Sequence, residues 1–368
     1  MTTPRLNRLA YILQSAGLDA LVLNPGPSLT YLTGLQFHLM ERPTMAFFAP
    51  SGAITLVMAE LEALKAQGLP FSPQVFKYND DPSTWVGVYE QAVKAAGLDG
   101  KTIGLEPSRL RVLELRLFES TAPHARFISA QDSLSALRMQ KDASEVAAMR
   151  HAVKIAQKGL QAILPIVKPG VTERELASEL VLQILRAGSD PEFPFNPIVA
   201  SGANSANPHA VPTDRKLVSG DMLVFDWGAA VDGYFSDLTR TYAVGSLEKE
   251  MSAIANLVLN ANAAGRAAAK PGTAAGAVDQ AARAEIERGG YGAYFTHRTG
   301  HGIGMEAHEE PYIFGANKMV LAEGMTFTVE PGIYLPGRGG VRIEDNLVIT
   351  ADGAESLSDM PRQVTVLG

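Results

Sequence analysis

The sequence predicts a two-domain protein, with an α/β domain over residues 1–130 followed by an α+β domain of pseudo-two-fold symmetry over residues 131–368. The length of 368 residues exceeds one average domain. Strands alternate with helices in the first part, which is typical of α/β architecture. In the second part, two helices, a histidine-bearing segment and an acid-bearing strand pair occur twice in the same order. We therefore expect two related halves with a site between them.

The first 130 residues contain short apolar runs between amphipathic segments. Apolar runs of four or five residues bounded by Gly, Pro and Asn predict strands. We expect helices at 5–16, 60–67 and 85–96, and strands at 20–23, 45–48, 54–58 and 102–105. No cluster of catalytic residue types occurs here, so this domain is expected to serve as a scaffold or association module.

The second domain begins with two helices that carry capping boxes. Asp142 with Glu145, and Thr172 with Glu175, provide the side chains that satisfy free N–H groups at a helix start. The second helix is expected to stop at Gly188, before a loop at 190–215 that is rich in Pro, Asn, Ser and Gly. Further helices are predicted at 247–269 and 274–288, and acid-bearing strand pairs at 222–230 with 234–244 and at 325–330 with 340–348.

The first strand pair places two aspartates on one face. Asp232-Gly233 is a strong signal for a two-residue hairpin turn. Such a turn pairs Thr239 with Asp226, which makes Asp226 and Asp237 diagonal neighbours on one sheet face. Two carboxylates among apolar residues repel each other and are costly to desolvate unless a cation lies between them.

The second strand pair repeats this arrangement with glutamates. Glu330 and Glu344 lie roughly symmetrically about residues 337–340, and Arg342 shares the face of Glu344. With His301, which lies between two glycines, the four acids form an oxygen-rich ligand set without sulfur. Such a set suits two divalent ions about 3.5–4 Å apart. Oxygen ligands favour Mn²⁺, although Co²⁺ or Zn²⁺ would also fit.

Composition excludes several other classes of protein. The net charge of −7 with no basic block argues against a nucleic-acid or anionic-membrane partner, and the absence of cysteine excludes thiolate metal sites. The N-terminus has no secretory-signal pattern, and no run of about 18 apolar residues occurs. We therefore expect a soluble, cytoplasmic protein.

Together these motifs resemble the pita-bread metallopeptidases, specifically proline dipeptidases (prolidases) and aminopeptidase P. The resemblance covers most of the chain, with a creatinase-type N-terminal domain marked by Tyr31-Leu32-Thr33-Gly34. That domain makes the smaller methionine aminopeptidases a poorer match. The segments that carry the resemblance in the catalytic part are ASGANSANPH (200–209), DWG (226–228), SDLTRT (236–241), GHGIG (300–304), HEEP (308–311), VEPG (329–332) and VRIED (341–345).

The resemblance implies roles for individual residues. Asp226 would chelate one ion, Asp237 and Glu344 would bridge both, and His301 with Glu330 would complete the other. Glu330 is the expected proton shuttle. The substrate carbonyl is expected to contact His209 and His308, and Arg342 is a further candidate for substrate binding or for neutralising an acid. The implied substrate is a small peptide with proline in the second position, and the implied assembly is a homodimer.

Substrate length is the question that the motifs leave open. A dipeptidase must hold the free carboxylate of Xaa-Pro, whereas an aminopeptidase must leave space beyond proline. The loop after Gly34 contains His38, Glu41 and Arg42, and it resembles a loop of some bacterial prolidases that reaches the partner subunit's active site. This favours a dipeptidase, with an Xaa-Pro aminopeptidase as the alternative. A non-catalytic peptide-binding homologue and a metal-free creatinase-like amidinohydrolase are disfavoured, because all five metal ligands are present.

Overall fold

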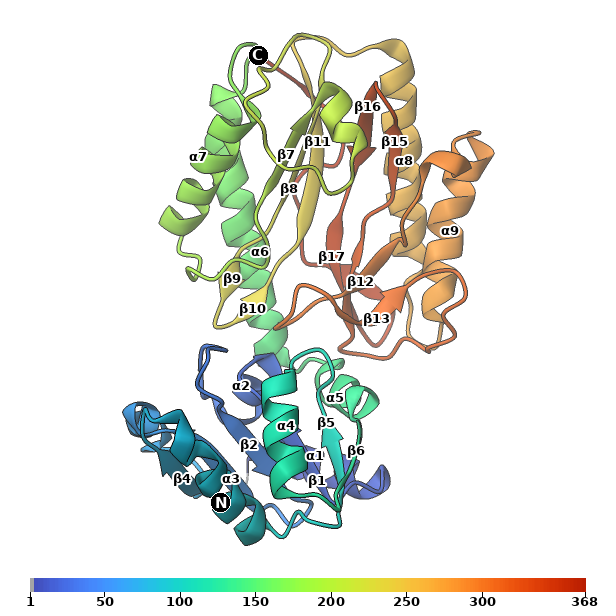
Figure 1. Cartoon of the computed structure of the whole chain (residues 1–368). Helices are drawn as coiled ribbons and strands as arrows, with labels where there is room; N and C mark the ends of the chain where they lie inside the picture. The colour runs from blue at the N-terminus through green and yellow to red at the C-terminus, as the bar shows by residue number, and fades with distance from the viewer. Residues whose placement is uncertain (1–2) are drawn as a thin grey trace. The chain divides into compact units, whose positions relative to one another are not determined.

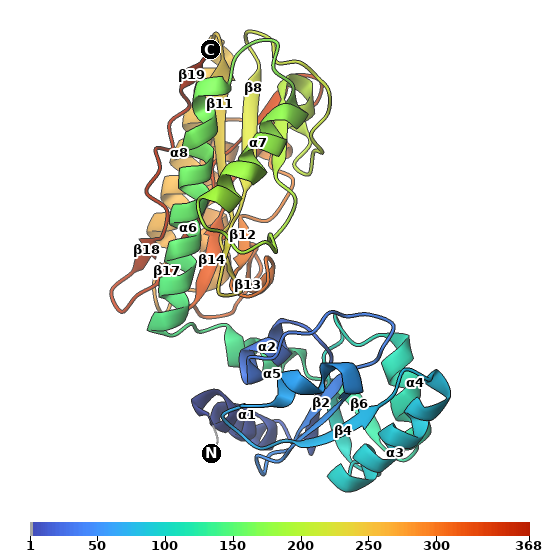
Figure 2. The same cartoon turned by 90° about the vertical axis from the view of Figure 1, so that its left-hand side faces the viewer.

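The structure is a computed structural model that describes residues 3–368. It contains two compact units, one ending at Arg138 and the other spanning Met139–Gly368 (Figures 1 and 2). Both contain mixed α/β structure.

The first unit is built on one six-stranded mixed sheet in the order β4-β3-β2-β1-β5-β6. Its central strand β1 is parallel to β5 and antiparallel to β2. Apolar side chains of these strands and of the helices α3 and α4 form the core. The strands are β1 (Ala20–Leu23), β2 (Met45–Phe48), β3 (Ile54–Ala59), β4 (Gln74–Tyr78), β5 (Thr102–Leu105) and β6 (Arg126–Ser129), and the helices are α1 (Pro4–Ser15), α2 (Pro27–Thr33), α3 (Trp85–Ala96), α4 (Val112–Thr121) and α5 (Gln131–Arg138).

The first half of the second unit packs two helices against a four-stranded sheet in the order β19-β11-β8-β7. Both predicted capping boxes form: Asp142 accepts hydrogen bonds from the N–H groups of Ser144 and Glu145, and Thr172 accepts one from that of Glu175. The elements are α6 (Ala143–Ile163), α7 (Glu173–Arg186), β7 (Ile198–Ser201), β8 (Met222–Trp227), β9 (Ala230–Val231), β10 (Tyr234–Phe235), β11 (Leu238–Val244) and β19 (Val366–Leu367).

The second half repeats the pattern with α8 and α9 packed against β15, β16 and the sheet β13-β12-β14-β17-β18 (Figure 1). The elements are α8 (Lys249–Ala268), α9 (Ala275–Arg288), β12 (Gly300–Gly302), β13 (Glu309–Ile313), β14 (Thr326–Val329), β15 (Gly332–Leu335), β16 (Gly339–Arg342), β17 (Asp345–Ile349) and β18 (Ala354–Ser356).

The first acid-bearing hairpin has the predicted register. Asp232 and Gly233 both have positive φ angles, of 52° and 76°, as a two-residue turn requires. Tyr234 pairs with Val231 and Thr239 pairs with Asp226, so the register is the same at both ends. The aspartates are therefore brought to one face by local turn chemistry.

The second strand pair also keeps one register throughout. Val329 pairs with Asp345, and beyond a short break Gly332 pairs with Arg342. Glu330 and Glu344 fall in this break at opposed positions. Glu344 bridges to Thr239 on β11, so the two acid-bearing strand pairs meet at Thr239, which also pairs with Asp226.

Three local predictions need correction. The segment 190–215 is not all loop, because Ile198–Ser201 forms β7 beside β8. Residues 60–67 form a 3₁₀ helix (Glu60–Ala66) that has no buried face. The strand predicted at 222–230 breaks after Trp227, where a side chain on Gly228 would come within 2.0 Å of the Ser236 carbonyl oxygen.

Candidate active site

Five predicted metal ligands converge in the second unit. Ligand atoms of Asp226, Asp237 and Glu344 lie within 4.8 Å of one another, and so do those of His301, Glu330 and Glu344. Glu344 belongs to both groups, so the five side chains form one continuous cluster. They come from both strand pairs and from β12, in agreement with the predicted site between the halves.

The carboxylates are buried and only partly satisfied by protein donors. Thr239 Oγ1 donates to Glu344 Oε2 at 2.6 Å, and Arg342 Nη2 donates to Asp226 Oδ2 at 2.5 Å. Asp226 Oδ1 and Glu344 Oε1 are buried and have no hydrogen-bond partner among residues 3–368. Burial and nearby carboxylates raise the pKa of Asp237 and Glu344 well above the usual range, and burial also raises the pKa of Asp226. Buried oxygens without donors are the ligands that a cation needs, so these residues fit a divalent metal centre.

Glu330 differs from the other three acids. Its Oε1 lies 3.3 Å from His301 Nε2 and accepts a hydrogen bond from Thr328 Oγ1 at 3.2 Å. Burial acts to raise its pKa, but the contact with His301 and the nearby His297 and Arg342 outweigh burial and lower it to about 2. Glu330 is therefore held as a carboxylate beside the imidazole.

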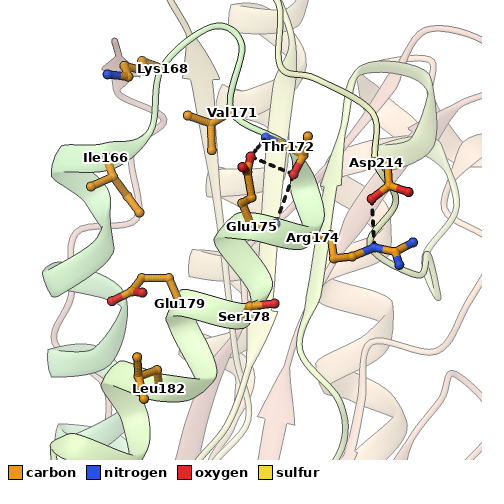
Figure 3. A pocket seen from close by; sticks show the side chains of 10 residues that line it. All are labelled: Ile166, Lys168, Val171, Thr172, Arg174, Glu175, Ser178, Glu179, Leu182 and Asp214. Atoms are coloured by element: carbon orange, nitrogen blue, oxygen red, sulfur yellow. Dashed lines mark hydrogen bonds and ion pairs between the residues drawn. The ribbon is translucent and has the colours of Figure 1, made fainter.

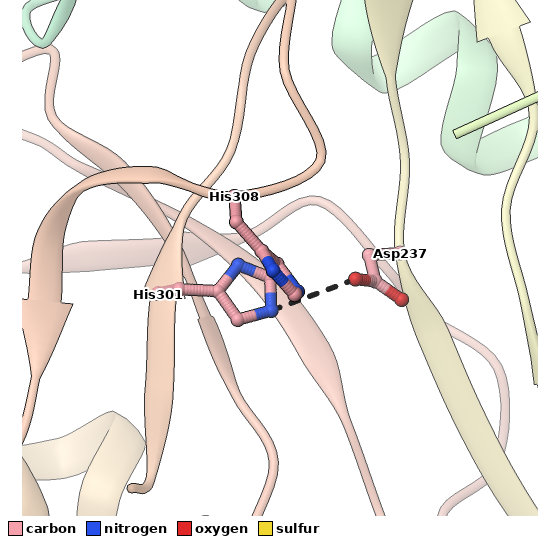
Figure 4. Close-up of side chains that lie close together, drawn as sticks. All are labelled: Asp237, His301 and His308. Atoms are coloured by element: carbon pink, nitrogen blue, oxygen red, sulfur yellow. Dashed lines mark ion pairs between the residues drawn. The ribbon is translucent and has the colours of Figure 1, made fainter. Parts of the chain in front are cut away.

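His301 and His308 lie side by side at the cluster, with Asp237 facing them (Figure 4). Their ring centres are 3.9 Å apart, and His301 Nε2 is 3.7 Å from Asp237 Oδ2. The His308 ring is accessible, yet partial desolvation and the neighbouring His301 lower its pKa to about 4. A neutral His308 can present a nitrogen to a ligand in front of the acids.

The glycines beside His301 let its strand pack tightly against neighbouring backbone. A side chain on Gly300 would come within 1.9 Å of the Thr328 carbonyl oxygen, and one on Gly302 within 2.2 Å of that of Glu310. They allow β12 to lie close to its neighbouring strands. This close packing places His301 against the acids.

Arg342 is engaged by protein groups on every nitrogen. Besides Asp226, its guanidinium donates to Thr239 Oγ1, the Pro208 carbonyl and Tyr334 Oη, at 3.0, 3.3 and 2.9 Å. Its position beside Asp226 agrees with the prediction that it neutralises an acid. It retains no open donor pair for a substrate carboxylate.

His297 and Tyr334 are site residues that the sequence motifs did not single out. His297 lines the same cavity as the acids, and its Nε2 lies 2.8 Å from Tyr334 Oη. Strand periodicity could have identified Tyr334, because positions 330, 332 and 334 share a face when a strand alternates. Burial raises the pKa of Tyr334 to about 12, so its hydroxyl stays protonated and can donate.

His209 lies on the rim of this cavity, in the loop that follows β7. The cavity has a volume of about 530 Å³ and is lined on another side by Pro194, Phe195 and Ile198. The loop is held at both ends by Glu173, which accepts hydrogen bonds from Ser201 N at 2.7 Å and Thr213 N at 3.0 Å. Glu173 is fully buried at the start of α7.

A second hollow lies beside α7, and several of its polar side chains are already paired with one another. Arg174 pairs with Asp214 at 3.1 Å, and the Glu175 carboxylate accepts from Thr172 in the helix cap (Figure 3). This hollow contains none of the predicted site residues.

His38 and Arg42 belong to the first unit, in the segment between α2 and β2. The Arg42 guanidinium contacts Glu41 and Asp80, both at 2.6 Å. These contacts and the Asp80 hydrogen bond raise its pKa. Arg42 is therefore already paired with two carboxylates within its own unit.

Residues 147–351 match the model of metallopeptidase family M24, and residues 5–140 match the creatinase/prolidase N-terminal domain. The chain belongs to metallopeptidase family M24. It is therefore a metallopeptidase, and membership of this family implies a site for divalent metal.

Individual relatives cover the whole length of this metallopeptidase. A Xaa-Pro dipeptidase of Lactobacillus delbrueckii subsp. lactis is 34% identical and covers 98% of both chains. A dipeptidase structure from Pyrococcus horikoshii is 36% identical, with a TM-score of 0.93 and coverage of 99% of this chain and 100% of that one. An X-Pro aminopeptidase structure from Thermotoga maritima is 30% identical, with a TM-score of 0.86 and full coverage of both chains.

Proposed function

We propose that this metallopeptidase hydrolyses the peptide bond of Xaa-Pro dipeptides, using two divalent ions. The observation that carries the proposal is the convergence of five ligand side chains around buried carboxylate oxygens without donors. The ligands would be Asp226, Asp237, His301, Glu330 and Glu344, with Asp237 and Glu344 shared between the ions. Oxygen-dominated ligands favour Mn²⁺.

The bound ions would supply Lewis acidity and lower the pKa of an attacking water. Glu330, as a carboxylate, would accept the proton of that water and pass it to the leaving proline nitrogen. His308 would stabilise negative charge on the substrate carbonyl oxygen, assisted by His209 at the cavity rim. Arg342 and Thr239 would hold Asp226 and Glu344 in position through their hydrogen bonds.

The deciding experiment compares Ala-Pro with Ala-Pro-Ala at equal concentrations, with Mn²⁺ and then with excess chelator. We expect metal-dependent release of proline from Ala-Pro and slow cleavage of the tripeptide. Faster cleavage of the tripeptide would make the protein an Xaa-Pro aminopeptidase, an outcome favoured by the resemblance to the Thermotoga maritima enzyme. Bound metal without cleavage of either peptide would favour a non-catalytic peptide-binding homologue.

We propose a cytoplasmic homodimer, with residues 1–130 as the association module and 131–368 as the catalytic domain. His38 and Arg42 would then act at the partner subunit's site. Over residues 3–368, no helix is both long and apolar enough to cross a bilayer. Sedimentation equilibrium tests the dimer, and an unchanged Ala-Pro turnover in Arg42→Ala would remove the role of that loop.

A further inference from the structure

Asp237 occupies a break between two strands, since it follows the end of β10 and directly precedes β11. The other aspartate of the cluster is held differently. Asp226 lies within β8 and pairs with Thr239 on one side and with Ile198 on the other. Neighbouring strands therefore fix the backbone that carries Asp226. The backbone that carries Asp237 needs a support of another kind.

The side chain of Asn346 provides that support. The Asp237 N–H donates to Asn346 Oδ1 at 3.0 Å, and Asn346 Nδ2 donates to the Asp237 carbonyl at 2.6 Å. Asn346 lies on β17 and is fully buried. Its amide carries a donor and an acceptor side by side, as a peptide group does. Asn346 thus replaces a neighbouring strand for this one residue.

The register of the two strand pairs explains why a side chain makes this connection. The antiparallel bridge between Thr239 and Glu344 sets the register in which the pairs meet. Two residues further along, this register places Asp237 opposite Asn346. However, β17 already lies between β14 and β18, and the Asn346 carbonyl accepts a hydrogen bond from the Leu357 N–H at 2.8 Å. The backbone of Asn346 is therefore occupied, and its amide reaches across instead.

We propose that Asn346 is a positioning residue for Asp237 and raises the affinity of the site for divalent metal. The inference rests on the proposed function, since it concerns the carboxylate that both ions would share. A ligand that is held in place before the ion arrives loses less freedom when it binds. Because Asn346 and Asp237 belong to different halves of the unit, metal affinity would also depend on how the halves pack.

The test is calorimetric titration of the metal-free protein with Mn²⁺. In Asn346→Ala we expect the Kd for Mn²⁺ to rise about 10- to 100-fold. A water can occupy the polar space and bond the Asp237 N–H and carbonyl, so the variant should fold. The Mn²⁺ concentration for half-maximal Ala-Pro turnover should rise by the same factor. At saturating Mn²⁺, kcat should fall less than about threefold, because Asn346 acts through Asp237.

Gln157→Ala is the matched control, because it also removes a buried amide that joins two segments. Gln157 Nε2 donates to Asp359 Oδ1 at 2.8 Å, and its Oε1 accepts from the N–H groups of Asp359 and Met360, both at 3.0 Å. We expect both variants to lower the Tm of the metal-free protein, and Gln157→Ala to leave the Kd for Mn²⁺ unchanged. An unchanged Kd in Asn346→Ala, or an equal rise in both variants, would overturn the inference.

A second variant keeps the test decisive if circular dichroism shows Asn346→Ala to be unfolded. Asn346→Ser retains a hydroxyl that can bond at most one of the two Asp237 groups at a time, so the loss of stability should be smaller. Its Kd for Mn²⁺ should still rise, because the paired contact is gone. A folded Asn346→Ser protein with the wild-type Kd would overturn the role of the amide.

Failure of the proposed function would be seen separately. A wild type that binds Mn²⁺ but cleaves neither Ala-Pro nor Ala-Pro-Ala would refute the peptidase assignment, and the comparison of Kd values would still decide the role of Asn346. An active wild type with equal Kd values in wild type and Asn346→Ala would refute the role of Asn346 alone. A wild type that binds no divalent metal would overturn both.

Discussion

At the residue scale, the site depends on carboxylates that the protein leaves incompletely bonded. Glu344 is 1% exposed, yet within the described part of the chain one of its oxygens has no hydrogen-bond donor, and one oxygen of Asp226 also lacks a donor there. Buried carboxylates without donors destabilise a fold unless a positive charge lies beside them. Metal binding and stability are therefore coupled at these side chains.

Replacing Glu344 by Gln should abolish metal binding and peptide hydrolysis together. The amide keeps the shape of the side chain but removes the charge shared by both ligand groups. Elemental analysis should find the metal content reduced and kcat lowered by more than about 1,000-fold. Glu355→Gln, an exposed acid paired with Arg150, is the control that should retain both. A metal-loaded, active Glu344→Gln enzyme would refute the ligand assignment.

The stability of the metal-free protein should fall as pH rises. Burial and like charges raise the folded-state pKa of Asp237 and Glu344, so both bind protons more tightly in the folded than in the unfolded chain. The resulting stability is complete below the unfolded pKa and is lost as pH rises through the folded value. Thermal unfolding with chelator should show Tm decreasing between about pH 5 and 8, and excess Mn²⁺ should remove this decrease. If the Tm of the metal-free protein rises with pH instead, the raised pKa values of Asp237 and Glu344 are wrong.

At the element scale, two helices position the segments that carry site residues. Glu173 at the start of α7 holds the ends of the His209 loop through Ser201 and Thr213. Asp279 and Arg283 of α9 hold the backbone around Arg298 in a similar way. A buried acid on a helix thus fixes a site segment in each half.

Glu173→Ala should damage both stability and catalysis. It leaves the buried donors of Ser201 and the partly buried N–H of Thr213 without an acceptor, which we expect to lower the free energy of unfolding by about 3 kcal/mol. The freed His209 loop should lower kcat/KM at least about tenfold with metal content unchanged, and Glu173→Gln should recover part of this loss.

Glu175→Ala provides the comparison on the same helix. It removes only the exposed hydrogen bonds that the Glu175 carboxylate accepts from Thr172 N and Oγ1, at about 1 kcal/mol, and should leave kcat/KM unchanged. Denaturant unfolding and steady-state kinetics measure both effects. Equal kinetic losses in the two variants would show that helix stability, and not the loop, limits activity.

At the scale of the whole molecule, the catalytic unit is joined at the acid cluster. The two acid-bearing strand pairs meet through the bridge between Thr239 and Glu344. Behind it, buried Asp345 accepts hydrogen bonds from Arg240 and Arg362 and fastens the C-terminal segment to the same strands. The metal ligands therefore come from both halves of a single packed structure.

Metal should accordingly stabilise the whole second unit. At a metal concentration about 1,000 times Kd, binding to the folded state alone adds about 4 kcal/mol. We expect differential scanning calorimetry to show a higher Tm for this unit with Mn²⁺ than with chelator. The Glu344→Gln protein should show almost no such shift. A shift of equal size in that variant would place the stabilising metal elsewhere.

Local signals accounted for much of the fold. The Asp232-Gly233 turn set the hairpin register, and the caps at Asp142 and Thr172 set the helix starts, because each depends on residues close in the chain. Strand β7 was not predicted because its three apolar residues lie among turn-forming residues and gain a partner only when β8 packs beside them.

The sequence by itself determined the family motifs, the helix order and the acids of each strand pair, since turn chemistry and period-two alternation act over a few residues. Only the tertiary structure decided which groups are already paired. It engaged Arg342 and Arg42 with acids and placed Arg298 over the Tyr312 ring. Pairing of this kind depends on segments far apart in the chain, whose meeting no local pattern specifies.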